Sequence, residues 1–282
     1  MRKRLTRRTL CDTNSNIMKP KYLFLLACLF CCIIVSCSKD DDEPQPKDYA
    51  PGEIPGLGNA EGELTGTPFK LPDGVELTGE ITGGGDLDRY WNLSYDESSS
   101  NYAFTAKDGT VTTRSLAPKT RAGENAYYFG SGYGYVDLII PMRNSRSSSV
   151  TVTFPAALIL RNDAGDCQNG VLIKKVTVTI PAGADYHLNL AFYCGNADKG
   201  AAGGSDRYSL GVVSDAKPLL DLCDRVKNKK INIEEFDPTK QEDFSTYNEQ
   251  RNSFQNIVWL ITDDSGLTET EISYINSLPI RR

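Results

Sequence analysis

Few side chains in this sequence can act as nucleophiles or general bases, and two of them share one segment. Residues 184–196, ADYHLNLAFYCGN, contain Cys194 and the chain's only histidine, His187. A thiolate is a nucleophile and an imidazole is the usual base near neutral pH, so a Cys-His pair is the first chemistry to consider. If the segment is a strand, its two-residue period places Cys194 on an apolar face and His187 on the opposite, solvent-facing one. Taken alone, the strand favours a buried structural cysteine.

The composition weakens several enzyme classes. With one histidine, serine-hydrolase triads and histidine-bearing zinc sites have little support. Pairs of carboxylates occur at Asp86 and Asp88 and at Asp263 and Asp264. They leave a hydrolase as a weaker alternative, because acidic loop residues are usually just solvated. GGGDLD at residues 83–88 lacks the further ligands of a calcium loop, so a turn is favoured, and we expect no metal, no cofactor and no turnover.

The beginning of the chain is typical of a lipoprotein signal. Met18-Lys19-Pro20-Lys21 is a basic start, and residues 22–36 form a fifteen-residue apolar run. The run is short for a transmembrane helix, which needs roughly 20 apolar residues, but it suits a signal-peptide core. It ends in Ile34-Val35-Ser36-Cys37, which resembles the lipobox of bacterial lipoproteins and implies acylation of Cys37. Residues 1–17 are interpreted as an upstream extension.

An acidic, proline-containing segment follows Cys37. SKDDDEPQP, residues 38–46, favours a solvated tether, and it also resembles the surface-export signal of Bacteroidota lipoproteins. Residues 1–36 carry seven of the 31 Lys and Arg and one of the 37 Asp and Glu, so the remainder has a formal charge of −12. Such a chain is a poor candidate for binding nucleic acid or anionic lipid directly. These features predict a protein on the outer face of the outer membrane, held by acylated Cys37.

Three cysteines remain after the signal and the lipid site are set aside: Cys167, Cys194 and Cys223. In an oxidising, exported compartment, an odd number leaves at least one thiol unpaired, reactive or modified. Cys167 lies in the loop sequence DCQNG and is expected to be exposed or paired. Cys223 lies at helical spacing and is expected in the core. One hypothesis is a disulfide between Cys167 and Cys223 that leaves Cys194 as the odd thiol.

The middle of the chain is rich in alternating β-branched runs. They span residues 126–141, 148–160, 171–181 and 184–196, with Gly, Asn, Asp and Pro between them and no helix pattern. This spacing predicts a mainly antiparallel β-sandwich or barrel. The Asn-Gly at residues 169–170 predicts the end of a hairpin loop.

The C-terminal third predicts a small helical lobe, which makes the fold class α+β. Asp215 is expected to cap a first helix, a second spans about 245–261, and a third follows the capping box Thr268-x-x-Glu271. The predicted domains are the extension and signal at 1–36, a Pro/Gly-rich tether at 37–60, an irregular region with short hairpins at 61–123, and the β core with its helical lobe at 124–282.

The second predicted helix completes a pattern that begins with Cys194. In FQNIVWLITD, residues 254–263, Gln255 and Trp259 are four apart and therefore neighbours on one helix face. An aromatic-Cys at a strand end, then a loop, a short strand and a helix, then Gln-x-x-x-Trp resembles the thioester domains of bacterial surface adhesins. The resemblance covers about residues 184–264, under a third of the chain. It departs from the family after the cysteine, where Gly195-Asn196 replaces a more apolar continuation.

The resemblance implies an internal thioester between the side chains of Cys194 and Gln255. A thiolate attacks a carboxamide and expels ammonia only when folding holds the two groups in near-attack contact. A target amine or hydroxyl on a host or surface macromolecule would then be captured covalently on Gln255, once per molecule. Four aromatic residues are expected to pack around the bond and shield it from water: Phe192, Tyr193, Phe254 and Trp259.

Two interpretations stay open beside the reactive one. In both of them, Cys194 and Gln255 are ordinary packed residues. The protein is then either a structural surface lipoprotein or a surface lipoprotein that binds its ligand, for instance a glycan, without a covalent bond. Aromatic residues expected to be exposed would supply that binding: Tyr90, Trp91, Tyr133 and Tyr135. Unchanged ligand retention in a Cys194→Ala variant would favour this alternative.

Overall fold

The computed structural model describes residues 45–84, 104–105, 111–112, 126–132, 134–237 and 240–281, the shortest segments and residues 126–127 as backbone only. Several residues singled out in the sequence lie outside this part of the chain: Cys37, Asp86, Asp88, Tyr90, Trp91 and Tyr133. Within the described residues no helix is long and apolar enough to cross a membrane.

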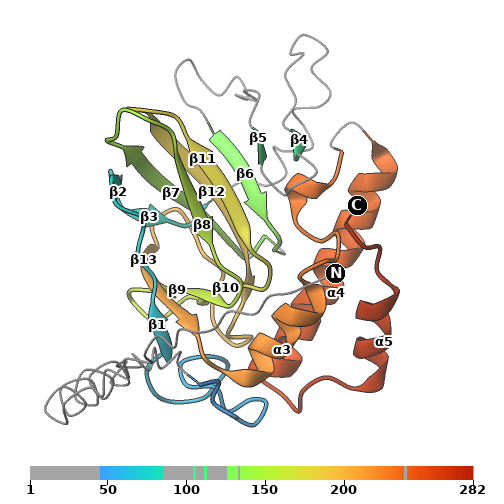
Figure 1. Ribbon diagram of the computed structural model, residues 1–282. Helices are drawn as coiled ribbons and strands as arrows, with labels where there is room; N and C mark the ends of the chain where they lie inside the picture. Colours follow the sequence, from blue (N-terminus) through green and yellow to red (C-terminus); the bar gives the residue numbers. More distant parts are fainter. Residues whose placement is uncertain are drawn as a thin grey trace, which may run out of the picture. The chain divides into compact units, whose positions relative to one another are not determined.

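The strands of the described residues follow one another along the chain from residue 66 to residue 214 (Figure 1). They are β1 (Gly66–Pro68), β2 (Val75–Leu77), β3 (Ile81–Thr82), β4 (Phe104–Thr105), β5 (Val111–Thr112), β6 (Ala126–Gly130), β7 (Val136–Asn144), β8 (Val150–Phe154), β9 (Leu158–Asn162), β10 (Gly170–Leu172), β11 (Val176–Ile180), β12 (Asp185–Cys194) and β13 (Arg207–Ser214). The helices are α3 (Lys217–Val226), the 3-10 turn η2 (Ile233–Glu235), α4 (Gln241–Thr262) and α5 (Glu269–Ser277).

Six strands close into an antiparallel barrel. Their order is β7, β3, β13, β9, β10 and β12, and β12 returns to β7 over the register from Asp185↔Arg143 to Phe192↔Val136. The closure confirms the predicted α+β class with a mainly antiparallel β core, and it selects the barrel over the sandwich. Closing the sheet removes free edges among these six strands. The predicted hairpin also forms, between β9 and β10.

One edge of β12 pairs with two different strands in succession. β6 runs parallel to β12 from His187↔Ala126 to Ala191↔Gly130, and β10 then takes over with Tyr193↔Val171 and Cys194↔Gly170. β8 and β11 form a separate two-stranded ladder, as do β4 and β5. β12 therefore has strands on both edges from His187 to Ala191, β7 alone at Phe192, and β10 at Tyr193 and Cys194.

Segments interpreted from the sequence as irregular or as tether contribute to the folded body. β1 pairs with β13, β2 pairs with β7, and β3 pairs with both β13 and β7. Residues 45–60 also pack on the body, since Ile54 and Leu57 are buried. The tether prediction is wrong for residues 45–60, because two apolar side chains of this Gly- and Pro-rich stretch are buried in the core of the folded body.

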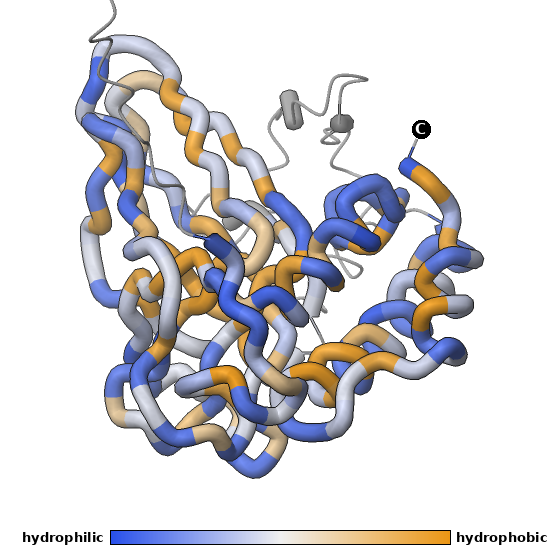
Figure 2. The backbone as a smooth tube through the Cα atoms, turned by 60° about the horizontal axis from the view of Figure 1, so that its bottom comes forward, coloured by the Kyte–Doolittle hydropathy of each residue, from blue (hydrophilic) through white to orange (hydrophobic). Residues whose placement is uncertain are grey.

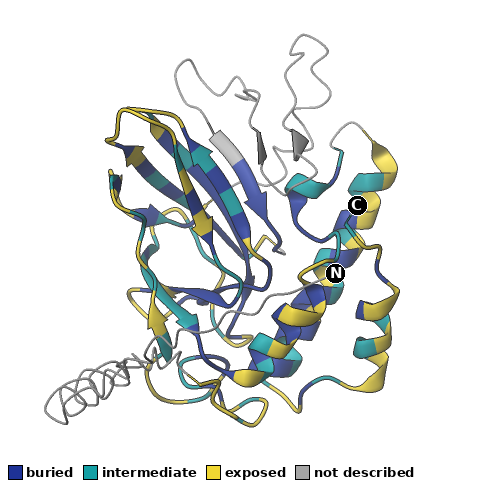
Figure 3. Ribbon diagram, in the orientation of Figure 1, coloured by how far each residue is buried: buried dark blue, intermediate teal, exposed yellow. Residues whose placement is uncertain are grey.

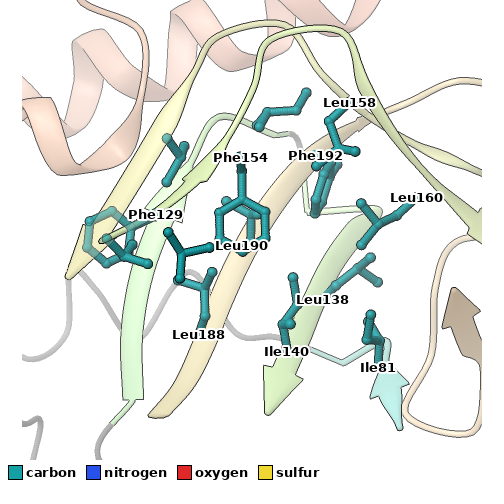
Figure 4. Close-up of a cluster of buried hydrophobic side chains, with 14 of the residues drawn as sticks. Ile81, Phe129, Leu138, Ile140, Phe154, Leu158, Leu160, Leu188, Leu190 and Phe192 are labelled. Carbon is teal, nitrogen blue, oxygen red and sulfur yellow. The ribbon is translucent and has the colours of Figure 1, made fainter. Parts of the chain in front are cut away.

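The barrel interior is filled by the alternating apolar residues of its strands. Figure 4 shows Leu188, Leu190 and Phe192 projecting from β12 into the same cluster as Leu138 and Ile140 from β7. This two-residue period is the one that the sequence predicted for β12. The buried residues in Figure 3 lie mainly on these strands and along α4, while α5 and the loops are more exposed.

A second apolar cluster joins the outside of the barrel to the helices. It contains Tyr193 from β12, Val171 from β10 and the buried faces of α3 and α4. Hydrophobic and hydrophilic residues alternate along the helices, as Figure 2 shows, because each helix buries only one face. This cluster fixes α4 beside the end of β12.

The helix boundaries test three sequence predictions. The capping box of α5 is confirmed, with Thr268 and Glu271 bonding reciprocally. α4 begins at Gln241, one turn before the predicted start. Asp215 does not cap α3; Ala216 holds that position, since the Asp215 carboxylate instead accepts from Thr65 Oγ1 at 2.7 Å and pairs with Lys47 Nζ at 3.0 Å.

Candidate functional site

Cys194 is the last residue of β12 and is fully buried. Its side chain belongs to the barrel cluster, together with Phe192, and Trp259 of α4 packs against the same cluster. His187 lies on the opposite face of the strand and is half-buried. The strand parity predicted from the sequence is thus confirmed, and it separates the only histidine from the thiol.

Gln255 lies on α4 with 1 % of its surface exposed. Its side-chain oxygen Oε1 accepts from the backbone N–H of Cys194 at 2.9 Å, and its Nε2 donates to the backbone carbonyl of Cys194 at 3.0 Å. One carboxamide therefore satisfies both main-chain groups of one residue 61 positions away. The fold brings together the two residues that the sequence paired.

The four predicted shielding residues divide between the two faces of β12. Tyr193 and Phe254 pack on the helix side, with ring centroids 6.2 Å apart and planes tilted by 50°. Phe192 lies in the barrel interior, and Trp259 is partly buried against the barrel cluster. Cys194 and Gln255 are therefore buried, with aromatic residues packed on both faces of the strand.

Burial and charge keep the thiol protonated. Burial is the main reason that the pKa of Cys194 is raised, and the negative charges of Asp137 and Asp263 raise the pKa further. Burial also raises the pKa of the Asp263 carboxyl, against hydrogen bonds from Thr262 and the backbone N–H of Ala197. The sulfur is therefore a neutral thiol at rest, and a proton must leave it before it can attack.

The turn after Cys194 is tightly built, although Gly195-Asn196 departs from the thioester-domain pattern. A Cβ on Gly195 would lie 2.9 Å from Leu57 and from Val171. The Asn196 side chain is 1 % exposed, and its Oδ1 accepts from the backbone N–H of Asn169 at 3.0 Å. Sequence reasoning missed both asparagines, because a single Asn in a loop carries no signal of burial.

The remaining cysteines correct two predictions. Cys167 is buried rather than exposed, and Cys167, Cys194 and Cys223 are all free thiols, so the hypothesised disulfide between Cys167 and Cys223 is not present. Burial raises the pKa of the Cys223 thiol to about 12 and that of Cys167 to about 11. Cys223 lies in the helix-side core, as predicted. Tyr135, which was expected to be exposed, is partly buried against the barrel core.

A buried charge cluster that the sequence did not suggest lies near the helical lobe. Lys174 and Glu235 are each 4 % exposed and are joined at 2.6 Å, with Arg281 Nε 3.4 Å from the same carboxylate. Burial lowers the pKa of Lys174. Burial, together with Glu235, raises the pKa of Glu234 to about 7. Glu234 accepts from the backbone N–H of Gly130 at 2.9 Å and so ties η2 to β6.

No group of three or more His, Cys, Asp or Glu side chains arranged to hold a metal ion occurs within the described ranges. The carboxylates Asp263 and Asp264 end α4 next to the site, and Asp263 is bonded to Thr262 and Ala197. Comparisons with protein-family models, with curated proteins and with solved structures found no match for this chain.

Proposed function

We propose that this protein is a lipid-anchored cell-surface adhesin-like protein that captures a target amine or hydroxyl through an internal thioester between Cys194 and Gln255. It acts once per molecule and is not an enzyme. The single observation that carries the proposal is the double hydrogen bond between the Gln255 carboxamide and the main chain of Cys194.

That contact supports the bond-forming step in two ways. The N–H of Cys194 donates to Oε1, so it polarises the carbonyl and is placed to stabilise the negative charge that develops on oxygen when a nucleophile attacks Cδ. The bond from Nε2 to the Cys194 carbonyl fixes the plane of the amide and orients the nitrogen that must leave. An unactivated amide gains both effects from one residue.

Formation of the bond conserves atoms as follows. The sulfur of Cys194 attacks Cδ of Gln255, the Cδ–Nε2 bond breaks, and the nitrogen leaves as ammonia with the proton that the thiol gave up. Because the thiol pKa is raised, this proton transfer is part of the same event rather than an earlier ionisation. The reaction needs no oxidant and no cofactor.

In the capture step the sulfur of Cys194 is the leaving group instead of the nucleophile. The amine or hydroxyl of the target attacks Cδ, the Cδ–Sγ bond breaks, and the proton released by the nucleophile restores the Cys194 thiol. The target remains attached to Gln255 by an amide or an ester. A thiol with a raised pKa is a poor leaving group, so the buried thioester persists until a well-placed nucleophile arrives.

Burial explains how a reactive bond survives in an aqueous compartment. Cys194, Tyr193, Phe254 and Phe192 are fully buried, and Gln255 is 1 % exposed. Water reaches such a bond only when part of the surrounding structure opens. The lipobox at residues 34–37 and the acidic run after it support attachment to the outer membrane with the folded body outside.

Methylamine treatment tests the proposed capture. The protein beginning at residue 38 is incubated with methylamine and digested, and the peptide that contains Gln255 is analysed by mass spectrometry. We expect methylamine on Gln255 and a free thiol at Cys194. Gln250 is the internal control, because it is a second buried glutamine on α4, 4 % exposed.

Three outcomes oppose the proposal. Methylamine on Gln250 as well as Gln255 would indicate ordinary amide exchange. If no adduct forms even when the protein is unfolded and refolded in methylamine, no reactive bond is present. A Cys194→Ala variant that still acquires methylamine on Gln255 would also contradict the mechanism, because the sulfur is required.

A further inference from the structure

The segment of residues 52–58, here called the cover segment, crosses the end of β12 and the end of α4. Its Gly58 N–H donates to the backbone carbonyl of Gly195 at 2.7 Å, one residue after Cys194. Its Gly52 N–H donates to the carbonyl of Ile261 at 2.9 Å, in the last turn of α4. The cover segment therefore joins the two elements that carry Cys194 and Gln255.

Two buried asparagines fasten the cover segment. Asn196 Nδ2 donates to the carbonyls of Gly58 at 2.9 Å and Gly56 at 3.3 Å, and Asn169 Nδ2 donates to the carbonyl of Gly56 at 3.0 Å. Asn169 also receives the Gly195 N–H on its backbone carbonyl at 2.9 Å. The turn that follows Cys194 is thus built to hold the cover segment by its carbonyl groups.

Apolar anchors close the contact. Leu57 is fully buried and Ile54 is 1 % exposed, and both belong to the cluster that contains Tyr193 and Phe254. The two shielding residues on the helix side of the site therefore share their packing with the cover segment. Leu57 also lies against the turn after Cys194, since a Cβ on Gly195 would be 2.9 Å from it.

We propose that the cover segment is a removable lid that regulates access of the target nucleophile to the Cys194–Gln255 thioester. This inference rests on the proposed function and adds its regulation. The other side of the thiol is the closed barrel interior, which opens only if paired strands separate. The cover segment belongs to no strand or helix and is held by five hydrogen bonds and the buried side chains of Ile54 and Leu57, so it opens at lower cost than the paired strands of the barrel.

The chain sequence connects the lid to the predicted anchor. The acidic run at residues 38–46 leads into Lys47, which pairs with Asp215 at 3.0 Å and whose backbone N–H bonds to the Asp215 carbonyl at 2.7 Å. The cover segment follows five residues later. Lys47 therefore ties the chain just before the cover segment to Asp215.

Glycine substitutions with matched backbone strain test the lid. Gly58 has φ +55° and a Cβ there would lie 1.9 Å from the carbonyl oxygen of Thr262, so Gly58→Ala forces the cover segment away from α4. Gly183 has φ +65° and nothing within 4 Å of a Cβ, so Gly183→Ala carries the same left-handed strain without touching the lid. Leu57→Ala and Leu188→Ala, both fully buried, form a second pair that separates the lid from the barrel core.

The readouts separate failure of the lid from failure of the thioester. Methylamine incorporation at Gln255 measures access in protein that contains the thioester, and iodoacetamide alkylation of Cys194 measures access in protein that does not, each followed by peptide mass spectrometry. We expect Gly58→Ala and Leu57→Ala to react at least about tenfold faster than Gly183→Ala and Leu188→Ala by whichever readout applies. Wild-type protein without an ammonia-deficient mass would reject the proposed function, while the alkylation rates would still decide the lid.

Hydrogen exchange in the unchanged protein gives a result that needs no variant. We expect the amide protons of Gly52 and Gly58 to exchange faster than those of Leu190 and Phe192 in β12, through an opening smaller than global unfolding. Exchange of the cover segment only by global unfolding, or equal labelling rates within each matched pair, would overturn the proposal.

Discussion

The carboxamide of Gln255 and the main chain of Cys194 are paired at both ends, with Oε1 accepting at 2.9 Å and Nε2 donating at 3.0 Å. The pairing fixes how far α4 sits along β12. It also continues the strand's hydrogen bonding at Cys194 with a side chain from a helix. Structure and proposed chemistry therefore depend on the same contact, and the two roles need separate tests.

Replacing Gln255 measures the structural role. In a Cys194→Ala background, where no thioester can form, we expect Gln255→Met to lower the free energy of unfolding by about 3 kcal/mol, because two buried backbone groups lose their partners. Denaturant unfolding measures this change. Gln250→Met in the same background is the matched control. Its buried side-chain oxygen has no hydrogen-bond partner among the described residues, so a loss as large as that at Gln255 would contradict the account.

Phe254 holds the helix side of the site. Its ring is fully buried and packs against Tyr193 at 6.2 Å and Tyr274 at 6.1 Å between ring centroids. We expect Phe254→Ala to reduce the free energy of unfolding by about 3–5 kcal/mol, the usual cost of a large cavity. Phe244→Ala, a partly buried ring at the edge of another cluster, should cost clearly less in the same thermal or denaturant melts. Equal losses would show that Phe254 has no special packing role.

Glu234 should make stability depend on pH near neutrality. Its folded pKa is raised from 4.5 to about 7, so the folded state binds more protons than the unfolded state between these values. The stabilisation is present below pH 4.5 and is lost as the pH rises through about 7. We expect Glu234→Gln to reduce the fall in melting temperature between pH 5 and pH 8. An unchanged pH profile in that variant would assign the effect to another group.

Lys174 should be sensitive to removal of its charge. It is buried with Glu235 at 2.6 Å, and loss of one partner of a buried ion pair costs about 3–5 kcal/mol. We expect Lys174→Met to lose about that much in denaturant unfolding. Lys175→Met is the control at the next position, where the side chain is exposed, and it should change stability little. Comparable losses at both positions would contradict the assignment of the charge pair.

Local patterns were enough to predict the longer strands of the β core and the face of Cys194. The alternation from Leu188 to Cys194 indicates which side chains enter the barrel, because successive side chains of a strand point to opposite faces. The capping box at Thr268 was predictable for the same reason, since its partners are three residues apart. The pairing of Cys194 with Gln255 came from resemblance to a family pattern, because nothing local links residues 61 apart.

What the sequence could not predict depends on distant partners. Asp215 has the residue type of a helix cap. Its carboxylate instead pairs with Lys47 and accepts a hydrogen bond from Thr65, both far away in the sequence. Residues 45–60 have the composition of a tether, and only the fold supplies the core that accepts Leu57. Asn196 departs from the thioester-domain pattern. The structure gives a role for it, because its side chain donates a hydrogen bond to the Gly58 carbonyl of the cover segment.

The mass of the intact, untreated protein tests the central claim most directly. Purified protein beginning at residue 38 should be lighter than its sequence mass by one ammonia, and Cys194→Ala and Gln255→Ala variants should each have their full sequence mass. Peptide mapping should then find Cys194 and Gln255 in one crosslinked species. A wild-type protein of full sequence mass, with a freely titratable Cys194 thiol after unfolding, would contradict the thioester.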